Sequence, residues 1–438
     1  MKPLNILYIH SHDTGTYIQP YGHAIPTPKL QHLAEEGVLF RNAFNVNPTC
    51  SPSRAALLTG QYPHQNGMFG LAHRGFALND PTRHLASFLR RNGYHTVLAG
   101  VQHVTHGTPG NIEALGYAEH HPNHLGAVKF LEGKPKGPFF LAVGFMETHR
   151  AGPPNQEDFF RDVDPVDSRF LRPPDPIPDT PETRDDMAHF VASAQTLDRK
   201  MGEVFDALEA AGLADNTLVI CTTDHGIAFP RMKCNLEDDG THVLLILRGP
   251  KGFRGGKVID ALVNHLDVYP TVCALTELDP PAWLEGKTLV PLVDDEADTL
   301  HDTLFSEINY HCAYEPVRAA RTKRWKYVRR FEPRPGPVLI NTDRSPSKAL
   351  WIRHGWPTMA PAQEALYDLV FDPHEKENLV GSPQHADVLD DMRTRLAAFM
   401  KQTKDPLLDD RVPLLDAYKV NSADDVDPQD PLLPSGQR

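Results

Sequence analysis

The chain has 438 residues, of which 40% are hydrophobic and 23% are charged, as in an ordinary globular protein with room for two or three domains. Its formal net charge of −13 and its lack of a basic run argue against nucleic-acid and membrane-surface partners. The five cysteines are spread out without a C-x-x-C pair, which argues against a disulfide framework or a zinc knuckle. The apolar run near the N-terminus is too short for a secretion signal or a membrane span, so we expect a cytoplasmic protein.

Short apolar runs alternate with helical patterns over the first 300 residues. Runs of strand length rich in β-branched and aromatic residues predict buried strands at 4–10, 94–100, 138–145, 216–224 and 242–250. The spacing of apolar residues predicts a helix at 27–37 and a long helix at 180–212, with Thr180 as its N-cap and Gly212 at its end. This alternation predicts an α/β domain over residues 1–300.

The remaining segments differ from this pattern. Prolines are dense at 150–181, which indicates a long ordered loop on the surface. Residues 301–404 read as a smaller subdomain, an antiparallel sheet with a helix near 384–402 packed on it. The polar tail at 405–438 either wraps the surface or is partly disordered.

Histidines and carboxylates follow four of the predicted strands. Ligands of open α/β sheets bind at the carboxyl ends of the strands, so these side chains should meet at one edge. In chain order they are His12 and Asp13, then Gln102 and His103, then Glu147 and His149, and finally Asp224 and His225. Two Asp-His pairs suit one divalent cation, and imidazole donors fit Mn, Fe or Zn better than Ca or Mg. His103 and His149 are then free for proton transfer or anion contact. His64, His95 and His121 have no such placement and are interpreted as surface residues.

The stretch "CSPSRAALLTG", from Cys50 to Gly60, places a cysteine in a polar turn at the start of a helix. It resembles the C-x-P-S-R-A-x-L-L-T-G signature of the sulfatase family in the alkaline-phosphatase superfamily. The likeness is strongest to the heparan N-sulfatase (sulfamidase) branch with its bacterial members, and "LFRNAF", "HQNGMFGL" and "ALYDLVFDPHEKENL" extend it over most of the chain. The resemblance implies a large mixed central sheet flanked by helices, with a smaller C-terminal antiparallel sheet plus helix.

The resemblance also implies that Cys50 is oxidised to formylglycine (3-oxoalanine), with a formylglycine-generating enzyme as a transient partner. One hydroxyl of the hydrated aldehyde attacks sulfur, and the other expels sulfate by re-forming the aldehyde. The family's metal ligands fall on His12, Asp13, Asp224, His225 and residue 50. Its remaining catalytic residues fall on Arg54, His103, His149 and Lys233. By the resemblance, Arg54 orients the formylglycine and His103 contacts it. His149 donates to the leaving group, and Lys233 binds sulfate.

Three departures from the family pattern bear on the metal and the substrate. His12 stands where the family usually has Asp, His225 stands where calcium sulfatases have Asn, and Val101 replaces a family lysine. The resemblance implies Ca²⁺, whereas the two histidines leave room for Mn²⁺.

The leading hypothesis is a formylglycine-dependent hydrolase of a sulfate ester or sulfamate, acting on a sulfated sugar or small organosulfate. Hydrolysis of a phosphonate monoester or phosphodiester is the alternative, and a binding protein with unmodified Cys50 is a third. A homo-oligomer is left open. Specificity is expected at a substrate rim formed by Gln102, Glu307, His311 and Arg318, although solvated positions of an ordinary strand explain the last three equally well.

Overall fold

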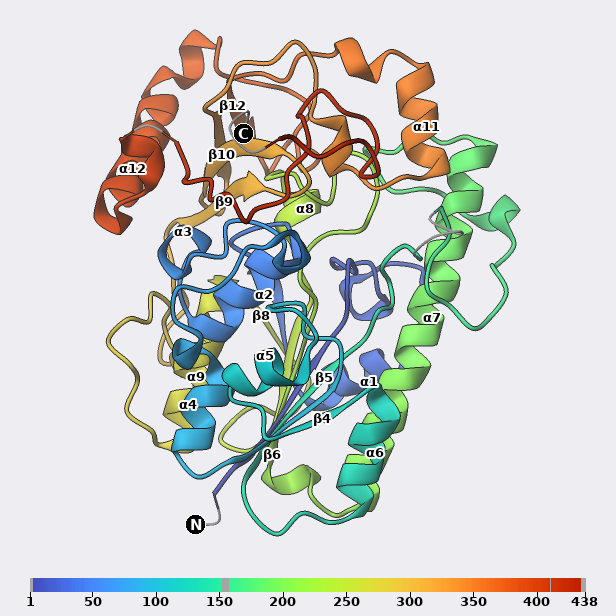
Figure 1. Ribbon diagram of the computed structural model, residues 1–438, viewed down its shortest axis with the longest axis vertical. Coiled ribbons are helices and arrows are strands. Elements are labelled where there is room, and N and C mark those ends of the chain that lie inside the picture. The colour runs from blue at the N-terminus through green and yellow to red at the C-terminus, as the bar shows by residue number, and fades with distance from the viewer. Residues whose placement is uncertain (1–2, 152–156, 410, 435–438) are drawn as a thin grey trace.

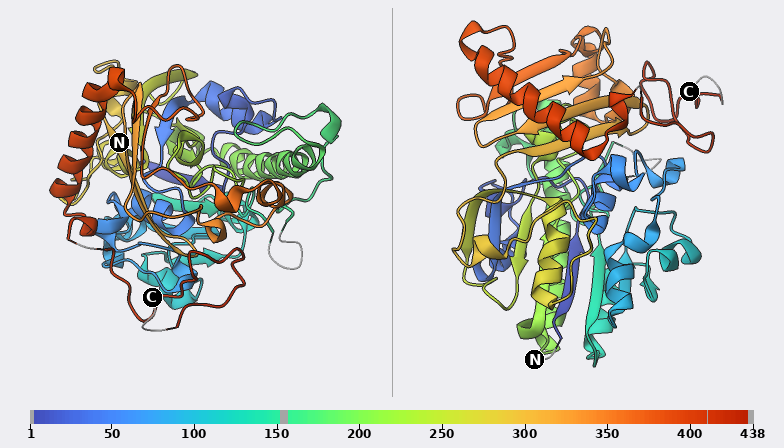
Figure 2. Two further views of the ribbon diagram at one scale, coloured as in Figure 1. Left: turned by 90° about the horizontal axis from the view of Figure 1, so that it is seen from above. Right: turned by 90° about the vertical axis from the view of Figure 1, so that its left-hand side faces the viewer.

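The computed structural model describes residues 3–151, 157–409 and 411–434, and it has two parts stacked along the long axis of the molecule (Figure 1). The larger part is an eight-stranded sheet with helices on both faces. The smaller part is a four-stranded antiparallel sheet that carries one long helix (Figure 2). This arrangement confirms the expected fold class.

The large sheet has the strand order β4-β3-β5-β1-β6-β7-β2-β8. Its strands are β1 Asn5–His10, β2 Val38–Phe44, β3 His95–Gly100, β4 Glu119–His121, β5 Phe139–Gly144, β6 Thr217–Thr222, β7 Leu245–Arg248 and β8 Lys257–Asn264. Neighbouring strands pair in parallel, except that β7 runs antiparallel to both β6 and β2. The carboxyl ends of β1, β2, β3, β5 and β6 therefore meet at one edge. All five predicted strands are present, and β2, β4 and β8 escaped prediction.

Both faces of the large sheet are buried, so its central strand reads as a continuous apolar run. Along β1, Leu7 and Ile9 point to one face, and Ile6 and Tyr8 point to the other. The first face is covered by α1 Pro28–Glu36, α6 His124–Glu132 and α7 Pro181–Ala210. The second is covered by α2 Cys50–Thr59, α4 Leu85–Arg91 and α9 Val268–Thr276. Short helices lie in the connections: α3 Pro63–Asn66, α5 Pro109–Ala114, α8 Asp238–Thr241 and α10 Val290–Val293.

The longest helix, α7, begins as its sequence predicts. The Thr180 hydroxyl accepts a hydrogen bond from the Thr183 amide at 3.4 Å, and Pro181 occupies the first turn. The helix ends at Ala210, two residues before Gly212. Within the described part of the proline-rich span, residues 157–180, the one helical element is a single 3₁₀ turn at Ser168–Phe170. Residues 152–156 of that span lie outside the described residues.

The C-terminal sheet has the strand order β12-β11-β10-β9. Its elements are β9 Leu304–Tyr310, β10 Tyr314–Arg321, β11 Trp325–Arg330, α11 Pro346–Arg353, β12 Glu364–Asp368 and α12 Ala386–Thr403. One face packs against Leu389, Met392 and Leu396 of α12. The chain then returns across the large domain, where Arg74 Nη1 donates to Asn421 Oδ1 at 2.7 Å.

A buried ion cluster joins the two parts of the molecule. Asp238 lies at the start of α8, and its carboxylate meets Arg321 Nη2 at 2.9 Å and Lys326 Nζ at 2.8 Å, from β10 and β11. Burial alone would raise the pKa of Asp238, but Arg321 and Lys326 hold it far below its ordinary value. The folded state therefore binds this proton much more weakly than the unfolded chain does.

We predict that Asp238→Asn lowers the free energy of unfolding by about 3 kcal/mol at pH 7, because it removes the carboxylate that both cations share and leaves Lys326 with Glu375 at 3.4 Å. Because the pKa of Asp238 is lower in the folded state, its ionised carboxylate stabilises the fold at pH values above the unfolded-state pKa of about 4. This stabilisation is lost as the pH falls through the folded-state pKa. The difference between wild type and variant should therefore shrink on acidification below about pH 4, measured by urea unfolding at a series of pH values. The control Asp391→Asn, in an exposed pair with Arg395, should change stability by less than about 0.5 kcal/mol. An equal effect of the two substitutions would contradict this role for Asp238.

Candidate active site

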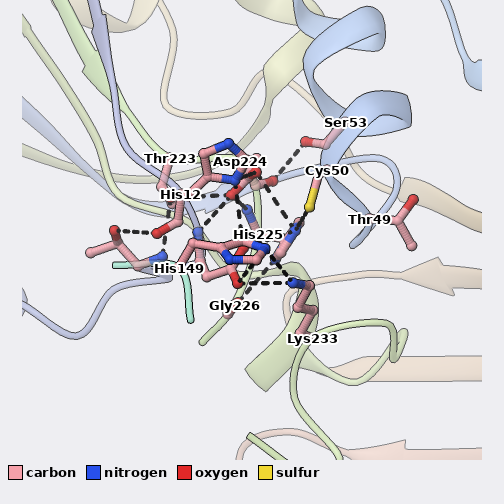
Figure 3. Close-up of polar contacts among 12 residues, drawn as sticks. His12, Thr49, Cys50, Ser53, His149, Thr223, Asp224, His225, Gly226 and Lys233 are labelled. Atoms are coloured by element: carbon pink, nitrogen blue, oxygen red, sulfur yellow. Dashed lines mark hydrogen bonds and ion pairs between the residues drawn. The ribbon is translucent and has the colours of Figure 1, made fainter. Parts of the chain in front are cut away.

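The cysteine of the signature lies at the first position of α2, directly over the sheet edge. Cys50 is 2% exposed, and its Sγ lies 3.3 Å from His225 Nε2 (Figure 3). The first turn of α2 is fastened to the loop after β6, because the Ser53 hydroxyl donates to the Asp224 carbonyl oxygen at 2.6 Å. Burial raises the pKa of the Cys50 thiol well above its ordinary value, so the unmodified residue is a neutral thiol.

The two Asp-His pairs come together beneath this cysteine. His12 Nδ1 lies 3.1 Å from Asp224 Oδ2, and His225 Nε2 lies 3.4 Å from Asp13 Oδ1. The Asp13 amide donates to Asp224 Oδ1 at 2.8 Å, which ties the end of β1 to the end of β6. Asp13 has φ of 51°, in the left-handed region, so the chain reverses sharply after the strand.

The donor atoms of this cluster fit a divalent cation. The sets His12, Asp13, Cys50, His149 and Asp13, Cys50, Asp224, His225 each bring one atom per residue within 4.8 Å of one another. Within the described part of the chain, both ring nitrogens of His12 and the Oδ1 atom of Asp13 are buried without a hydrogen-bond partner. His12 Nδ1 lies 3.1 Å from Asp224 Oδ2, but the two atoms do not have the geometry of a hydrogen bond. Unpartnered buried donors and acceptors are costly, and coordination of a cation would satisfy them.

Two buried cations balance the carboxylates. Arg54 Nη2 lies 2.9 Å from Asp224 Oδ2 and 2.7 Å from the Ser11 carbonyl oxygen, and its Nη1 contacts His10 Nδ1. Burial would raise the pKa values of Asp13 and Asp224, but Lys233 beside Asp13 and Arg54 beside Asp224 hold both well below their ordinary value. Both carboxylates are therefore ionised at neutral pH.

Lys233 connects the cluster to the C-terminal part of the chain. Its ammonium group lies 2.9 Å from Asp13 Oδ2 and 3.0 Å from Asp343 Oδ2. Burial alone would lower the pKa of Lys233, but Asp13 and Asp343 raise it well above its ordinary value. Lys233 thus presents a fixed positive charge 3.4 Å from His149 Nε2.

His149 and His103 flank the cluster on its more open side. The side chain of His149 is 25% exposed, against 2% for Lys233, and its Nδ1 donates to the Arg150 carbonyl oxygen at 2.6 Å. Its Nε2 consequently faces Lys233 and Asp13. His103 Nε2 lies 3.2 Å from His73 Nδ1, and the His12 and His103 rings are 5.5 Å apart. Burial lowers the pKa values of both His103 and His149, which favours neutral imidazoles.

The expected substrate rim is only partly where the sequence placed it. Arg318 is fully buried and forms a two-point ion pair with Asp405, and Glu307 is fully buried against His64 and Asn309. These two side chains bind the C-terminal sheet to its neighbours, because period-2 alternation turns them inward. They therefore cannot form a rim, and His64 is not a surface residue. Gln102 folds back on its own turn, accepting from the Thr105 amide at 2.9 Å.

His311 and three side chains that sequence reasoning missed lie around the cluster. His311 is 7% exposed, and the Lys233 charge helps burial to lower its pKa. The missed residues are His10, which contacts Arg54, His73, which contacts His103, and Asp343, which contacts Lys233. His10 is in the same "HSHD" stretch as His12, so the motif carried a signal. Asp343 comes from an irregular segment after β11 and has no local signature.

We expect a divalent cation to stabilise the folded chain. Treatment with a chelator should lower the unfolding temperature, and added Mn²⁺ or Ca²⁺ should restore it, with a gain of about 2.7 kcal/mol at 100 times the dissociation constant. Asp224→Asn should abolish this dependence, whereas Asp260→Asn, in an exposed pair with Arg41, should retain it. Differential scanning fluorimetry measures the shift, and an identical cation response of Asp224→Asn and wild type would exclude this site.

Comparisons with known proteins agree with this geometry. Residues 4–278 match the family model described as Sulfatase, and residues 231–349 match the model described as N-sulphoglucosamine sulphohydrolase, C-terminal. The N-sulphoglucosamine sulphohydrolase of Homo sapiens is 31% identical over 464 residues, covering 92% of this chain and 91% of the relative.

Two solved structures show how widely the fold is shared. A 2-O GAG sulfatase superposes with a TM-score of 0.72 at 21% identity, covering 97% of this chain and 98% of that one. The phosphonate monoester hydrolase of Agrobacterium radiobacter superposes with a TM-score of 0.67 at 21% identity, covering 91% and 96%. The fold alone is shared by a sulfatase and a phosphonate monoester hydrolase, so it does not distinguish the two activities. The family model and the relative at 31% identity are both those of sulfatases. The chain therefore belongs to the sulfatase family and is a sulfuric ester hydrolase.

Proposed function

We propose that this sulfatase removes sulfate from a sulfated sugar, as a sulfamate or a sulfate ester, with a formylglycine made from Cys50 as its nucleophile. The observation that carries the proposal is the position of Cys50, 3.3 Å from His225 Nε2 at the edge of a cluster that also holds Asp13 and the buried Lys233. The relative at 31% identity is named for action on N-sulphoglucosamine, which supports a sulfated amino sugar.

The residues that would hold the cation are His12, Asp13, Asp224 and His225, together with residue 50. A bound divalent cation supplies charge neutralisation for a developing negative oxygen. Family resemblance implies Ca²⁺, but two imidazole donors favour a softer ion, so we propose Mn²⁺ as the preferred metal.

The remaining side chains bind the transferred group and manage its protons. Lys233 holds a permanent positive charge at the sulfate position, because Asp13 and Asp343 keep it protonated. Arg54 is fixed by Asp224 and the Ser11 carbonyl, so it can orient residue 50 without moving. His149 turns its Nε2 toward the same position; with its one proton on Nδ1, the neutral ring presents Nε2 as an acceptor that can take up a proton and pass it to the leaving oxygen or nitrogen.

The phosphonate alternative rests on the Asp-His metal pair and on Val101 in place of the family lysine. The family model and the human relative favour the sulfatase activity instead. With the lysine absent at 101, Lys233 and Arg54 are the site's buried cations among the described residues, so we assign most of the anion binding to Lys233.

We predict that enzyme carrying formylglycine hydrolyses N-sulfoglucosamine or 4-nitrophenyl sulfate with a kcat/KM at least about tenfold above that for 4-nitrophenyl phenylphosphonate. The peptide that spans Cys50 is first checked by mass spectrometry for the loss expected when a thiol becomes a carbonyl. A converted enzyme that prefers the phosphonate would reverse the assignment. If Cys50 stays unmodified in the native host, the protein is better explained as a non-catalytic binding protein.

We predict that Lys233→Met lowers kcat/KM by about two to three orders of magnitude, because one charge-stabilising group is lost from a buried site. Lys233→Arg should recover part of the loss by keeping the charge. Asp343→Asn should cost less than Lys233→Met, since Asp13 still holds the ammonium group. The exposed Lys29→Met, paired with Asp206, serves as a control with wild-type kinetics. Wild-type turnover by Lys233→Met would remove Lys233 from the site.

A further inference from the structure

A pocket separate from the catalytic cluster lies behind the loop that carries Lys233, between that loop and the C-terminal sheet. It has a volume of about 230 Å³. Its lining includes two arginines, two glutamates and two tryptophans, which are Arg231, Glu237, Glu315, Arg330, Trp351 and Trp356. Trp351 belongs to α11, which packs beside the upper end of α7 (Figure 1), and Trp356 follows in the next turn.

The pocket shares a wall with the catalytic cluster without using the same side chains. Arg231 and Asn235 line the pocket, and Lys233 between them faces the cluster. On the other side, Asn341 donates to Glu315 Oε2 at 2.9 Å and lies two residues before Asp343, the partner of Lys233. One layer of chain therefore separates the pocket from the catalytic cluster.

Several polar atoms of the lining are buried without a partner. Among the described residues, Glu237 Oε2, Arg330 Nε and Trp351 Nε1 make no hydrogen bond, and Glu237 is only 9% exposed. A buried donor or acceptor that stays unsatisfied destabilises the folded chain. These lining side chains therefore carry one acceptor and two donors that have no partner. Hydroxyl groups can both donate and accept, so a polyhydroxylated ligand matches this set.

The charges of the lining are largely offset, which disfavours a simple anion as the ligand. Arg330 Nη2 lies 3.5 Å from Glu237 Oε1. The rings of Trp351 and Trp356 lie 5.6 Å apart at 55° and provide apolar surface. Apolar walls with a few directed polar groups are typical of small-molecule sites.

We propose that this pocket is a second saccharide-binding site, which holds one sugar ring of the chain whose sulfated residue is the substrate. The apolar face of the ring packs on the tryptophans, and its hydroxyls pair with Glu237, Arg330 and Trp351. The volume of about 230 Å³ is below the range of about 300 to 1,000 Å³ for drug-sized ligands, so the pocket suits one ring rather than several. The choice of a saccharide rests on the proposed function.

The test measures binding of an unsulfated tetrasaccharide of alternating N-acetylglucosamine and glucuronic acid by isothermal titration calorimetry. This probe lacks the sulfate that the catalytic cluster recognises. Wild type should bind it, and Trp351→Ala should weaken binding about tenfold or more, as for a central aromatic anchor. Trp351→Phe should keep most of the affinity by retaining the ring face. Trp325→Ala, which removes a tryptophan of β11 outside the pocket, should bind as wild type does.

A wild-type chain that does not bind the probe, or a Trp351→Ala variant that binds it equally well, overturns the proposal. The kinetics provide a second measurement. Trp351→Ala should keep wild-type kcat/KM on 4-nitrophenyl sulfate while losing about tenfold on a tetrasaccharide that ends in N-sulfoglucosamine. Equal loss on both substrates would also overturn the proposal, because Trp351 would then act on the catalytic cluster rather than on the saccharide chain. A failure of the proposed function is seen separately, as the absence of sulfate release from any substrate by the converted wild type.

Discussion

The site depends on the balance of two buried carboxylates against two buried cations. Asp13 and Asp224 are fully enclosed, and neither could stay ionised there without Lys233 and Arg54 at 2.9 Å. The same four charges fasten β1, α2, β6 and the loop after it to one another. Precise placement of residue 50 is therefore a consequence of electrostatic compensation. Removal of Arg54 or Lys233 would leave a carboxylate buried without its cation, whereas Lys233 would keep Asp343 if Asp13 were removed.

The C-terminal sheet takes part in this balance from outside the catalytic domain. Asp343 adds a second carboxylate to Lys233, and the Asp238 cluster with Arg321 and Lys326 fixes the orientation of the sheet. Arg318 and Glu307, expected at a substrate rim, instead hold this sheet to Asp405 and His64. The smaller part of the molecule is thus a structural support for the catalytic loop, and the pocket lined by Trp351 lies at their junction.

Much of the site could be predicted from residue order, because parallel strands place their carboxyl ends together whatever their distance along the chain. His12, His103, His149 and His225 follow four such strands, and the structure gathers them. The strands β2, β4 and β8 escaped prediction since their apolar runs are short or interrupted by polar residues such as Arg41 and Asn42. The reversed direction of β7 has no sequence signal either, because a buried strand reads alike in both directions.

By itself, the sequence determined the α/β architecture, the helix that begins at Cys50 and the set of side chains at the sheet edge. These follow from local periodicity, from capping residues and from one specific signature. Only the tertiary structure decided which charges compensate one another, that Asp343 reaches Lys233 across 110 residues, and that Arg318 and Glu307 point inward. Such pairings depend on the packing of distant segments in a low-dielectric interior, and no neighbouring residue in the chain encodes them.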